Sequence, residues 1–569
     1  MVPSKHPDWR TFIGAGLACL LLAACAGDVP PQGGPIDRTS PAIVHTEPDT
    51  NAIRVRPRTL KLEFSKYVDR RTVEESVFIS PYLGKLEYDW SGTEVEITFA
   101  DTLRANTTYV VNVGTDVVDL RQGNRMAAGF TLAFSTGDSI DKGYISGRVF
   151  DEKPDGVMIF AYRLRGILPD TLNPAHAKPD YITQTGKEGE FVLAHLSLDP
   201  YRIFAIRDEY HNLLYDREID QYGVGPRDYV LDAPHPRITD VAFRLTKEDT
   251  TRPFVSGVTV RDRYRLSLRF SEALDSASVT RATLHVLDTL TQKEKALRLF
   301  YQERMQPAIL SLFLATPLDS PATYRVRATG VTDLAGNIID SSARGEVFFG
   351  SLSPDTIRPG IEVREMHDSI RGISVGGRID ILFSDPPAPF DVRGGISLLD
   401  SSKRVIDAKR QWSGAASLAL TASQPLLSKA WYTLLVRMDS LRSLNGLRYK
   451  DSTYRLRFQT MDLRTTGSIS GVVVDSAGGT GVVFLTATSI DLTPQRSATV
   501  TLPLPGPFQL EQLVEGKYVV SAFRDSDGSG KYSYGSPSPF IPSERFAVYP
   551  DTIRVRARWG VEGLYLHFK

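Results

Sequence analysis

The feature that most constrains the fold of this chain is an internal repetition of strand-like segments. An Asp that stands four residues before a Pro, ahead of an alternating apolar run, occurs as Asp37-Arg-Thr-Ser-Pro41, Asp249-Thr-Thr-Arg-Pro253 and Asp355-Thr-Ile-Arg-Pro359. Recurring segments of this kind are typical of an array of similar units, and not of one large core. We call the segments that follow these three motifs the first, second and third A units.

Each A unit carries the same later landmarks in the same order. A core block reads Leu62-Glu-Phe64-Ser-Lys66 in the first, Leu268-Arg-Phe270-Ser-Glu272 in the second and, in degenerate form, Ile381-Leu-Phe383-Ser-Asp385 in the third. A Thr-Tyr block and a turn follow, the turns being Asp119–Asn124, Asp333–Asn337 and Asn445-Gly446. Alternating apolar residues with Gly and Asn turns, in units of about 100 residues, predict β-sandwiches.

A second type of repeat, which we call the B unit, separates the A units and ends the chain. Its paired segments are Ile145-Ser-Gly147 with Ile469-Ser-Gly471, Phe191-Val-Leu193 with Phe508-Gln-Leu510, and Tyr201-Arg-Ile203 with Tyr518-Val-Val520. The last two pairs share the same offset in the sequence, which two chance matches would not. No long helical pattern interrupts these segments.

These repeats predict an all-β chain of tandem β-sandwich domains in A-B-A-A-B order behind a lipidated, flexible tether. The predicted boundaries are a leader at 1–24, a tether at 25–40, A units at 41–138, 249–352 and 353–462, and B units at 139–248 and 463–569.

The first residues read as a secretory leader. Lys5 and Arg10 precede an apolar run from Phe12 to Ala24, which is too short to span a bilayer. The run closes on Leu22-Ala-Ala-Cys25, which resembles a bacterial lipobox and makes Cys25 the predicted lipidation site. Two or more acyl chains anchor a protein stably. An ordinary signal peptide with an incidental cysteine, and a transmembrane anchor, are the alternatives.

Cysteine usage and charge exclude several classes of function. The chain has 2 cysteines, Cys19 and Cys25, so cleavage and lipidation leave no thiol for a disulfide, a thiolate metal site or a nucleophile. Lys and Arg together number 67, as do Asp and Glu, so a nucleic-acid partner is not indicated. We therefore expect the membrane, through the lipid, as the first partner, and an envelope protein or polysaccharide of unknown identity as the second.

The units resemble known bacterial modules. The A units, through Phe-Ser-Glu-x-Leu-Asp275 and the turn ending at Asn337, resemble the bacterial Ig-like domain of envelope and S-layer proteins. The B units, through the Ile-Ser-Gly start and the block at 508–513, resemble the carboxypeptidase regulatory-like, transthyretin-type β-sandwich. The Pro- and Gly-rich start at 30–37 resembles Ig-like lipoproteins common in Bacteroidetes. Such modules imply spacers, adhesins or binding platforms more than an activity.

One loop has ligand-like chemistry. Asp525, Asp527 and Ser529 place oxygen side chains at alternate positions, with Gly530 sixth, as at the start of a calcium loop. Ser536 stands where the bidentate Glu of such a loop is expected, and the flanks read as strands. The alternative is a hairpin loop built from good turn formers. We predict no other cofactor.

No catalytic constellation emerges from the sequence. Glu272 and Asp275 lie at a strand end, where a structural or solvated role is expected, and Gly-x-Ser-x-Gly, a phosphate loop and a zinc-type His pair are absent. We therefore expect a non-catalytic envelope protein that acts as a stalk or an interaction and adhesion platform. The alternatives are a glycan-binding accessory subunit of an envelope enzyme system and a calcium-stiffened adhesin. Ala26, in place of an Asp after Cys25, favours the outer membrane, with the face left open.

Overall fold

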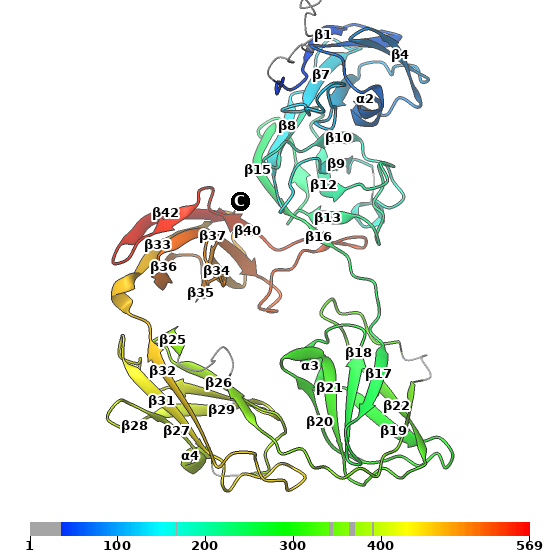
Figure 1. Ribbon diagram of the computed structural model, residues 1–569. Helices are drawn as coiled ribbons and strands as arrows, with labels where there is room; N and C mark the ends of the chain where they lie inside the picture. Colours follow the sequence, from blue (N-terminus) through cyan, green and yellow to red (C-terminus); the bar gives the residue numbers. More distant parts are fainter. Residues whose placement is uncertain (1–35, 167, 341–344, 364–369, 390–391, 569) are drawn as a thin grey trace, which may run out of the picture. The chain divides into compact units, whose positions relative to one another are not determined.

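The computed structural model describes residues 36–568, apart from residues 167, 341–344, 364–369 and 390–391 (Figure 1). The predicted leader, Cys25 and the first part of the tether lie outside the described residues. The chain divides into two compact units, Met1–Ile140 and Asp141–Lys569, which we describe separately.

The first compact unit contains the first A unit, a sandwich of two antiparallel sheets. One sheet has the order β1-β2-β5-β4, with β1 at Ile43–Glu47, β2 at Thr59–Phe64, β4 at Leu86–Ser91 and β5 at Glu94–Phe99. The other has the order β3-β6-β7, with β3 at Val77–Ser80, β6 at Thr108–Val113 and β7 at Phe130–Ser135. A short helix, α2 (Arg70–Ser76), joins the two sheets, and Asp69 caps its start.

The first B unit, in the second compact unit, mixes parallel and antiparallel pairing. Its smaller sheet is β11-β8-β15, in which β8 (Gly143–Phe150) runs parallel to β15 (Arg237–Arg244) and antiparallel to β11 (Glu190–Leu196). Its larger sheet is β10-β9-β12-β13-β16, with β14 on β12. The strands are β9 Met158–Arg163, β10 Tyr181–Gln184, β12 Pro200–Arg207, β13 Gln221–Val224, β14 Tyr229–Val230 and β16 Thr246–Lys247, and η1 is Pro169–Thr171.

The second A unit repeats the two-sheet arrangement of the first. Its sheets are β17-β18-β21-β20 and β19-β22-β23. The elements are β17 Val255–Val260, β18 Arg265–Phe270, α3 Ser276–Val279, β19 Thr283–Asp288, β20 Leu297–Glu303, β21 Gln306–Leu314, β22 Thr323–Thr329 and β23 Glu346–Phe349.

The third A unit also has two sheets despite its degenerate sequence, and its second sheet carries two additional strands, β25 and β28. The sheets are β24-β26-β30-β29 and β25-β32-β31-β27-β28. The elements are β24 Ile361–Val363, β25 Ile370–Ile373, β26 Arg378–Phe383, α4 Val392–Gly395, β27 Ile396–Leu399, β28 Val405–Ile406, β29 Ala408–Gly414, β30 Ser417–Ala422, β31 Trp431–Arg437 and β32 Thr453–Thr460.

The second B unit repeats the pairing of the first. In the sheet β36-β33-β42, β33 (Thr466–Asp475) runs parallel to β42 (Gly560–Phe568), and the larger sheet is β35-β34-β37-β40, with β41 on β37. The remaining elements are η2 Leu463–Thr465, β34 Val482–Ser489, β35 Ser497–Leu502, β36 Pro507–Val514, β37 Gly516–Asp525, β38 Ser536–Pro537, β39 Phe540–Ile541, β40 Phe546–Val548 and β41 Ile553–Val555.

The alternation in the sequence explains why these segments form half-buried strands. In β2, Leu60, Leu62 and Phe64 are buried while the residues between them are partly exposed, as the two-residue period of a strand requires. Each A unit also buries a Tyr whose hydroxyl accepts a backbone N–H five residues earlier: Tyr109 from Arg104 at 2.7 Å, Tyr324 from Asp319 at 2.9 Å, and Tyr432 from Leu427 at 2.9 Å. The prediction of tandem β-sandwiches is confirmed.

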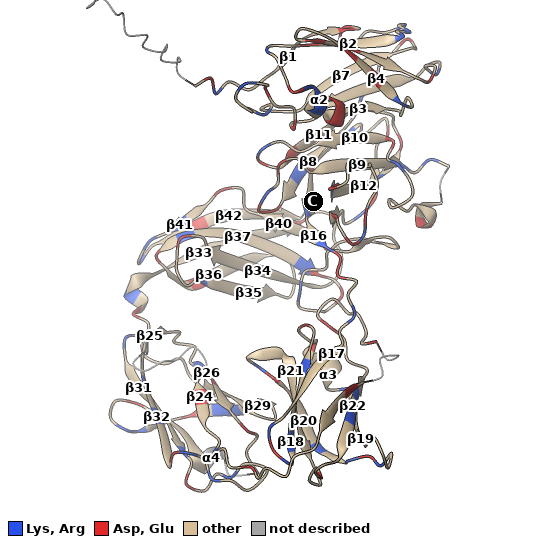
Figure 2. Cartoon of the chain, turned by 45° about the vertical axis from the view of Figure 1, so that its right-hand side comes forward, with Lys and Arg blue, Asp and Glu red and all other residues tan. Residues whose placement is uncertain are grey.

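Figure 2 shows acidic and basic residues interspersed along the strands and loops. Among the described residues, no helix is long and apolar enough to cross a membrane.

Candidate functional site

The loop that follows β37 is the site that the sequence singled out. Asp525 is buried, with 3% of its surface exposed, and its two carboxylate oxygens accept the backbone N–H groups of Ser529 at 3.1 Å and Gly530 at 3.0 Å. Asp527 is exposed and accepts the same Ser529 N–H at 2.9 Å. The Ser529 hydroxyl donates to the carbonyl oxygen of Lys531, within its own loop. Asp525 and Asp527 therefore converge on one point, with Ser529 beside them.

Glu544 is the third carboxylate of this site, and the sequence analysis did not find it. It is buried, and it accepts the backbone N–H groups of Ser526 at 2.6 Å and Ser533 at 3.1 Å. Asp525, Asp527 and Glu544 offer carboxylate oxygens that all lie within 4.8 Å of one another. Glu544 comes from the far side of the β38–β39 hairpin, so no fixed local spacing signals it.

The electrostatics of this loop arise from hydrogen bonds to carboxylates. Hydrogen bonds from the Ser529 side chain and backbone lower the pKa of Asp527 below its ordinary value. Backbone N–H groups that point at a carboxylate stabilise its charge in the same way that a cation does. The three carboxylates could hold a Ca²⁺ ion by their chemistry, whereas the N–H donors already compensate much of the charge of Asp525 and Glu544.

The first B unit has a counterpart of this loop. Asp208 accepts the N–H groups of Asn212 and Leu213, as Asp525 does from Ser529 and Gly530. Asp220 accepts the N–H of Glu209, as Glu544 does from Ser526. Burial, followed by the nearby charges of Asp208 and Asp216, raises the pKa of Asp220. A pair of buried carboxylates thus organises both loops, although the glycines are present in only one.

The aromatic residues near this loop pack within the structure. Tyr532 makes edge contacts with Phe523, Tyr534 and Phe546, at 5.9, 4.8 and 5.6 Å between ring centroids. Phe540 lies under the guanidinium of Arg202, 3.5 Å from the ring centroid, and the hydroxyl of Tyr222 donates to the Gly535 carbonyl. These residues therefore join the second B unit to the first.

A groove runs beside these contacts, between the two B units. Arg148 and Asp240 line it from the first B unit, and Arg545, Tyr565 and His567 from the second. Tyr565 is 56% exposed. An exposed aromatic ring beside charged side chains is suited to a polar ligand with an apolar face.

The paired carboxylates Glu272 and Asp275 do not form an acid–base pair. Asp275 accepts the N–H of Ser278 at 2.9 Å and caps α3, which is a structural role. Glu272, for which a structural or solvated role was expected, is partly buried and lies beside Asp249 and Asp333.

A family model for the bacterial Ig-like domain matches residues 37–136. No curated protein matches the chain. Among solved structures, the N-terminal part of the bacterial S-layer protein SbsC aligns at 13% identity over 37% of this chain and 44% of that one, with a TM-score of 0.17. This chain thus spans less than half of the length of that structure.

Two further solved structures cover different shares of the chain. SbsC domains 1–6 align at 10% identity over 91% of this chain and 66% of that one, with a TM-score of 0.15. An L,D-transpeptidase from Mycobacterium smegmatis aligns at 15% identity over 29% of this chain and 76% of that one, with a TM-score of 0.14.

Proposed function

We propose that this chain is a lipid-anchored protein of the bacterial cell envelope, whose β-sandwich units act as a non-catalytic stalk and interaction platform. The observation that carries the proposal is the succession of Leu22-Ala-Ala-Cys25 and five β-sandwich units, the first of which matches the bacterial Ig-like family. A lipid on Cys25 would anchor the chain stably, and tandem sandwiches would extend it from the membrane.

The resemblance of the B units to regulatory-like, transthyretin-type sandwiches is part of this proposal. Its support is the pairing that both B units share, in which the first strand of the unit runs parallel to a strand near its end: β8 to β15, and β33 to β42. The Pro- and Gly-rich segment at 30–37, which resembles Bacteroidetes lipoproteins, and Ala26, which favours the outer membrane, belong to the same proposal.

Metabolic labelling with a palmitate analogue tests the anchor. The wild-type chain should incorporate label and partition into the detergent phase, whereas Cys25→Ser should remain unlabelled, with Cys19→Ser as the matched control. An unlabelled wild-type chain would contradict the anchor. Hydrolytic activity of the purified chain that is lost on changing one acidic residue would contradict the non-catalytic role.

Protease shaving of intact cells then places the units. Digestion in intact cells would put them outside, and protection until lysis would put them in the periplasm. Cys25→Ser serves as the control for release from the membrane.

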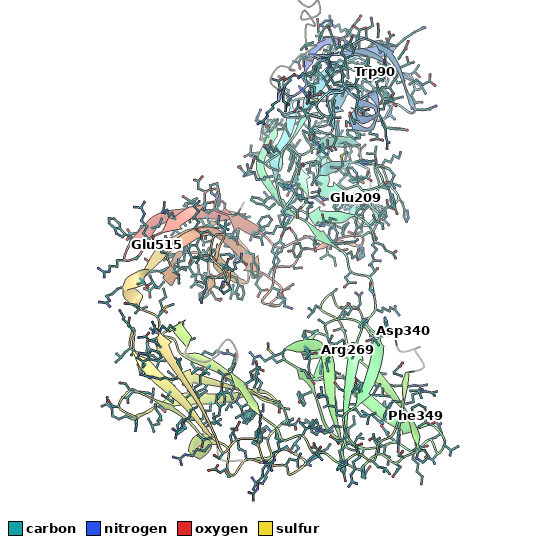
Figure 3. All side chains as sticks on the ribbon, in the orientation of Figure 1. Trp90, Glu209, Arg269, Asp340, Phe349 and Glu515 are labelled. Carbon is teal, nitrogen blue, oxygen red and sulfur yellow. The ribbon has the colours of Figure 1, made fainter. Side chains whose placement is uncertain are left out.

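A glycan-binding role is the second candidate, and the groove between the B units favours it. The full mature chain is applied to a glycan array together with Tyr565→Ala, and Phe349→Ala serves as the matched control. Phe349 is 76% exposed, lies outside the groove and is labelled in Figure 3. Binding that Tyr565→Ala removes and Phe349→Ala retains would support this role. The absence of binding by the wild-type chain would count against it.

The loop 525–530 supports the calcium-stiffened variant of the same platform. If Asp525, Asp527 and Ser529 help to hold Ca²⁺, Asp527→Ala should weaken calcium binding at this loop. Unchanged calcium binding in that variant would instead favour the alternative, a hairpin loop built from good turn formers that holds no ion.

A further inference from the structure

The three A units share a polar corner, at which three segments meet. The first segment brings the Asp that stands four residues before a Pro. The second brings the residue that follows Phe-Ser in the core block, and the third is the turn that follows the Thr-Tyr block. The equivalence rests on a repeated pair of hydrogen bonds. In each unit the N–H of residue 42, 254 or 360 donates to the hydroxyl of the core-block Ser, and the N–H of that Ser donates back to the carbonyl of the same residue. The corners consist of Asp37, Lys66 and Asp119 in the first, Asp249, Glu272 and Asp333 in the second, and Asp355, Asp385 and Ser443 in the third.

In the first A unit the chain supplies a cation to this corner. The Lys66 ammonium donates to Asp37 Oδ2 at 2.7 Å, to the Thr39 carbonyl at 2.9 Å and to the Thr39 hydroxyl at 2.8 Å. Asn124 Nδ2 links the corner further, since it donates to Asp119 Oδ2 at 2.6 Å and to the Asp37 carbonyl at 2.8 Å.

In the third A unit the cation comes from the unit before it. The Arg265 guanidinium donates to both carboxylate oxygens of Asp385 at 2.8 and 2.7 Å, and to Asp355 Oδ1 at 2.6 Å. Arg265 is 6% exposed, so these ion pairs are largely shielded from solvent. Asn445 also donates to Asp355, at 3.3 Å.

The second A unit keeps the framework of this corner without a cation. Asn337 Nδ2 donates to Asp333 Oδ2 at 2.9 Å and to the Asp249 carbonyl at 2.8 Å, as Asn124 does in the first unit. Asp249, Glu272 and Asp333 offer carboxylate oxygens that all lie within 4.8 Å of one another. Among the residues that the structure describes, no Lys, Arg or His forms an ion pair with any of the three.

A second observation also points to a missing ligand at this corner. Glu272 Oε1 is buried and has no hydrogen-bond donor among the described residues. A buried carboxylate oxygen without a partner is costly, because that oxygen has lost its water and has no donor in exchange. Asp333, beside it, is 2% exposed. The second corner therefore has Glu272 at the position of Lys66, and it lacks the positive group that Lys66 and Arg265 supply to the other two corners.

We propose that Asp249, Glu272 and Asp333 bind a Ca²⁺ ion, which neutralises the corner of the second A unit as Lys66 and Arg265 neutralise the other two. Ca²⁺ prefers carboxylate and carbonyl oxygens at about 2.3–2.6 Å, so two of its ligands can lie up to about 5 Å apart. Mg²⁺, with ligands at about 2.0–2.1 Å, spans a shorter distance and demands stricter geometry.

The ion would connect the B unit before this corner to the A unit that contains it. Asp249 lies between β16 of the first B unit and β17 of the second A unit, whereas Glu272 and Asp333 belong to the body of the A unit. Calcium binding at this corner therefore fixes the start of the connecting segment.

The test uses the full mature chain and CaCl₂ as the ligand. Isothermal titration after chelation should show calcium binding in the range of about 10⁻⁴–10⁻³ M that is typical of extracellular modules. Glu272→Gln should weaken this binding at least about tenfold, by removing one carboxylate ligand. Glu515→Gln, at an exposed carboxylate outside both acidic clusters, is the matched control and should leave it unchanged.

Glu272→Lys is the sharpest variant, because it installs the residue of the first A unit. This variant should lose calcium binding at the corner and should keep its thermal midpoint in chelator at or above that of the wild type, which excludes simple misfolding. The proposal is overturned if the wild type binds no calcium, if Glu272→Lys binds it unchanged, or if Mg²⁺ binds as tightly as Ca²⁺.

Discussion

The first and second A units differ most at one polar corner that is otherwise built alike. Both have an Asp before the first strand, a Ser that exchanges hydrogen bonds with the strand start, and an Asn that ties the turn to the Asp backbone. The difference lies at one position, where Lys66 in the first unit corresponds to Glu272 in the second. The first corner carries its own cation, and the second gathers three carboxylates.

The third A unit shows another solution to the same electrostatic problem. Its corner keeps Asp355 and Asp385 and takes a guanidinium from β18 of the second unit. The framework of the corner is therefore constant, while the source of its positive charge varies from one repeat to the next. A corner neutralised within the chain does not depend on calcium, whereas one that needs an ion responds to it.

The largest effect is expected from removing the guanidinium of the third corner. Arg265→Ala leaves Asp262, Asp355 and Asp385 together without their shared cation, and breaking a buried ion pair in this way costs about 3–5 kcal/mol. Urea unfolding monitored by the fluorescence of Trp412 and Trp431, both in the third A unit, measures the loss. Arg269→Ala is the control, since Arg269 lies on the same strand, is exposed and is labelled in Figure 3. Equal effects of the two variants would show that Arg265 does not hold this corner.

A smaller loss is expected from cutting the amide that the first two corners share. Asn337→Ala removes the hydrogen bonds to Asp333 and to the Asp249 carbonyl, and the loss of such bonds at buried groups costs about 1–3 kcal/mol. Asn124→Ala is the matched change in the first unit. Local hydrogen exchange at the two turns compares them. If only one turn became more labile, the corners would not share a framework.

Converting the first corner into the second should have a modest effect on stability. Lys66→Glu removes a partly exposed ion pair, which is worth about 1 kcal/mol or less, and brings Glu at position 66 beside Asp37 and Asp119. We expect the fluorescence of Trp90 to report a lower urea midpoint in chelator and a recovery in calcium. The wild-type first unit should show no calcium response. If the first A unit gained no calcium response in Lys66→Glu, the first and second corners would not be equivalent.

The smallest effects concern pH, and the two corners should respond in opposite directions. The hydrogen bond from Lys66, and then those from Thr39, hold the pKa of Asp37 well below its ordinary 3.8, so this pair stabilises the first unit above that pH and fades as the pH falls below it. Burial, and then the charges of Asp333 and Asp249, raise the pKa of Glu272, so without calcium the second unit gains stability as the pH falls from 7 toward 4.5.

Hydrogen exchange at each corner between pH 7 and 3 measures these changes, with temperature and intrinsic rates matched. Asp37→Asn and Glu272→Gln should each flatten the response of their own corner. A response of the same sign at both corners would contradict the assigned electrostatics.

The repeats made the fold predictable, because strand periodicity and turn residues are local signals. The degenerate third A unit still forms the two expected sheets, since Phe383, Tyr432 and Phe458 keep their buried positions. The sites were only partly predictable. Asp525, Asp527 and Glu272 were visible individually, whereas Glu544 and Asp333 join them through strand pairings that bring distant residues together. Arg265 belongs to one unit and neutralises the next, which no motif within a unit reveals.

Hydrogen exchange of the wild-type mature chain, with and without about 1 mM calcium, shows whether the second corner binds an ion that the first does not need. We expect slower exchange confined to the segment around residues 249–252 and to the turn at 333–337, with no change at the first corner around residues 37–39 and 119–124. Equal protection at both corners, or none at either, would contradict the proposal that the second corner needs an ion where the first has Lys66.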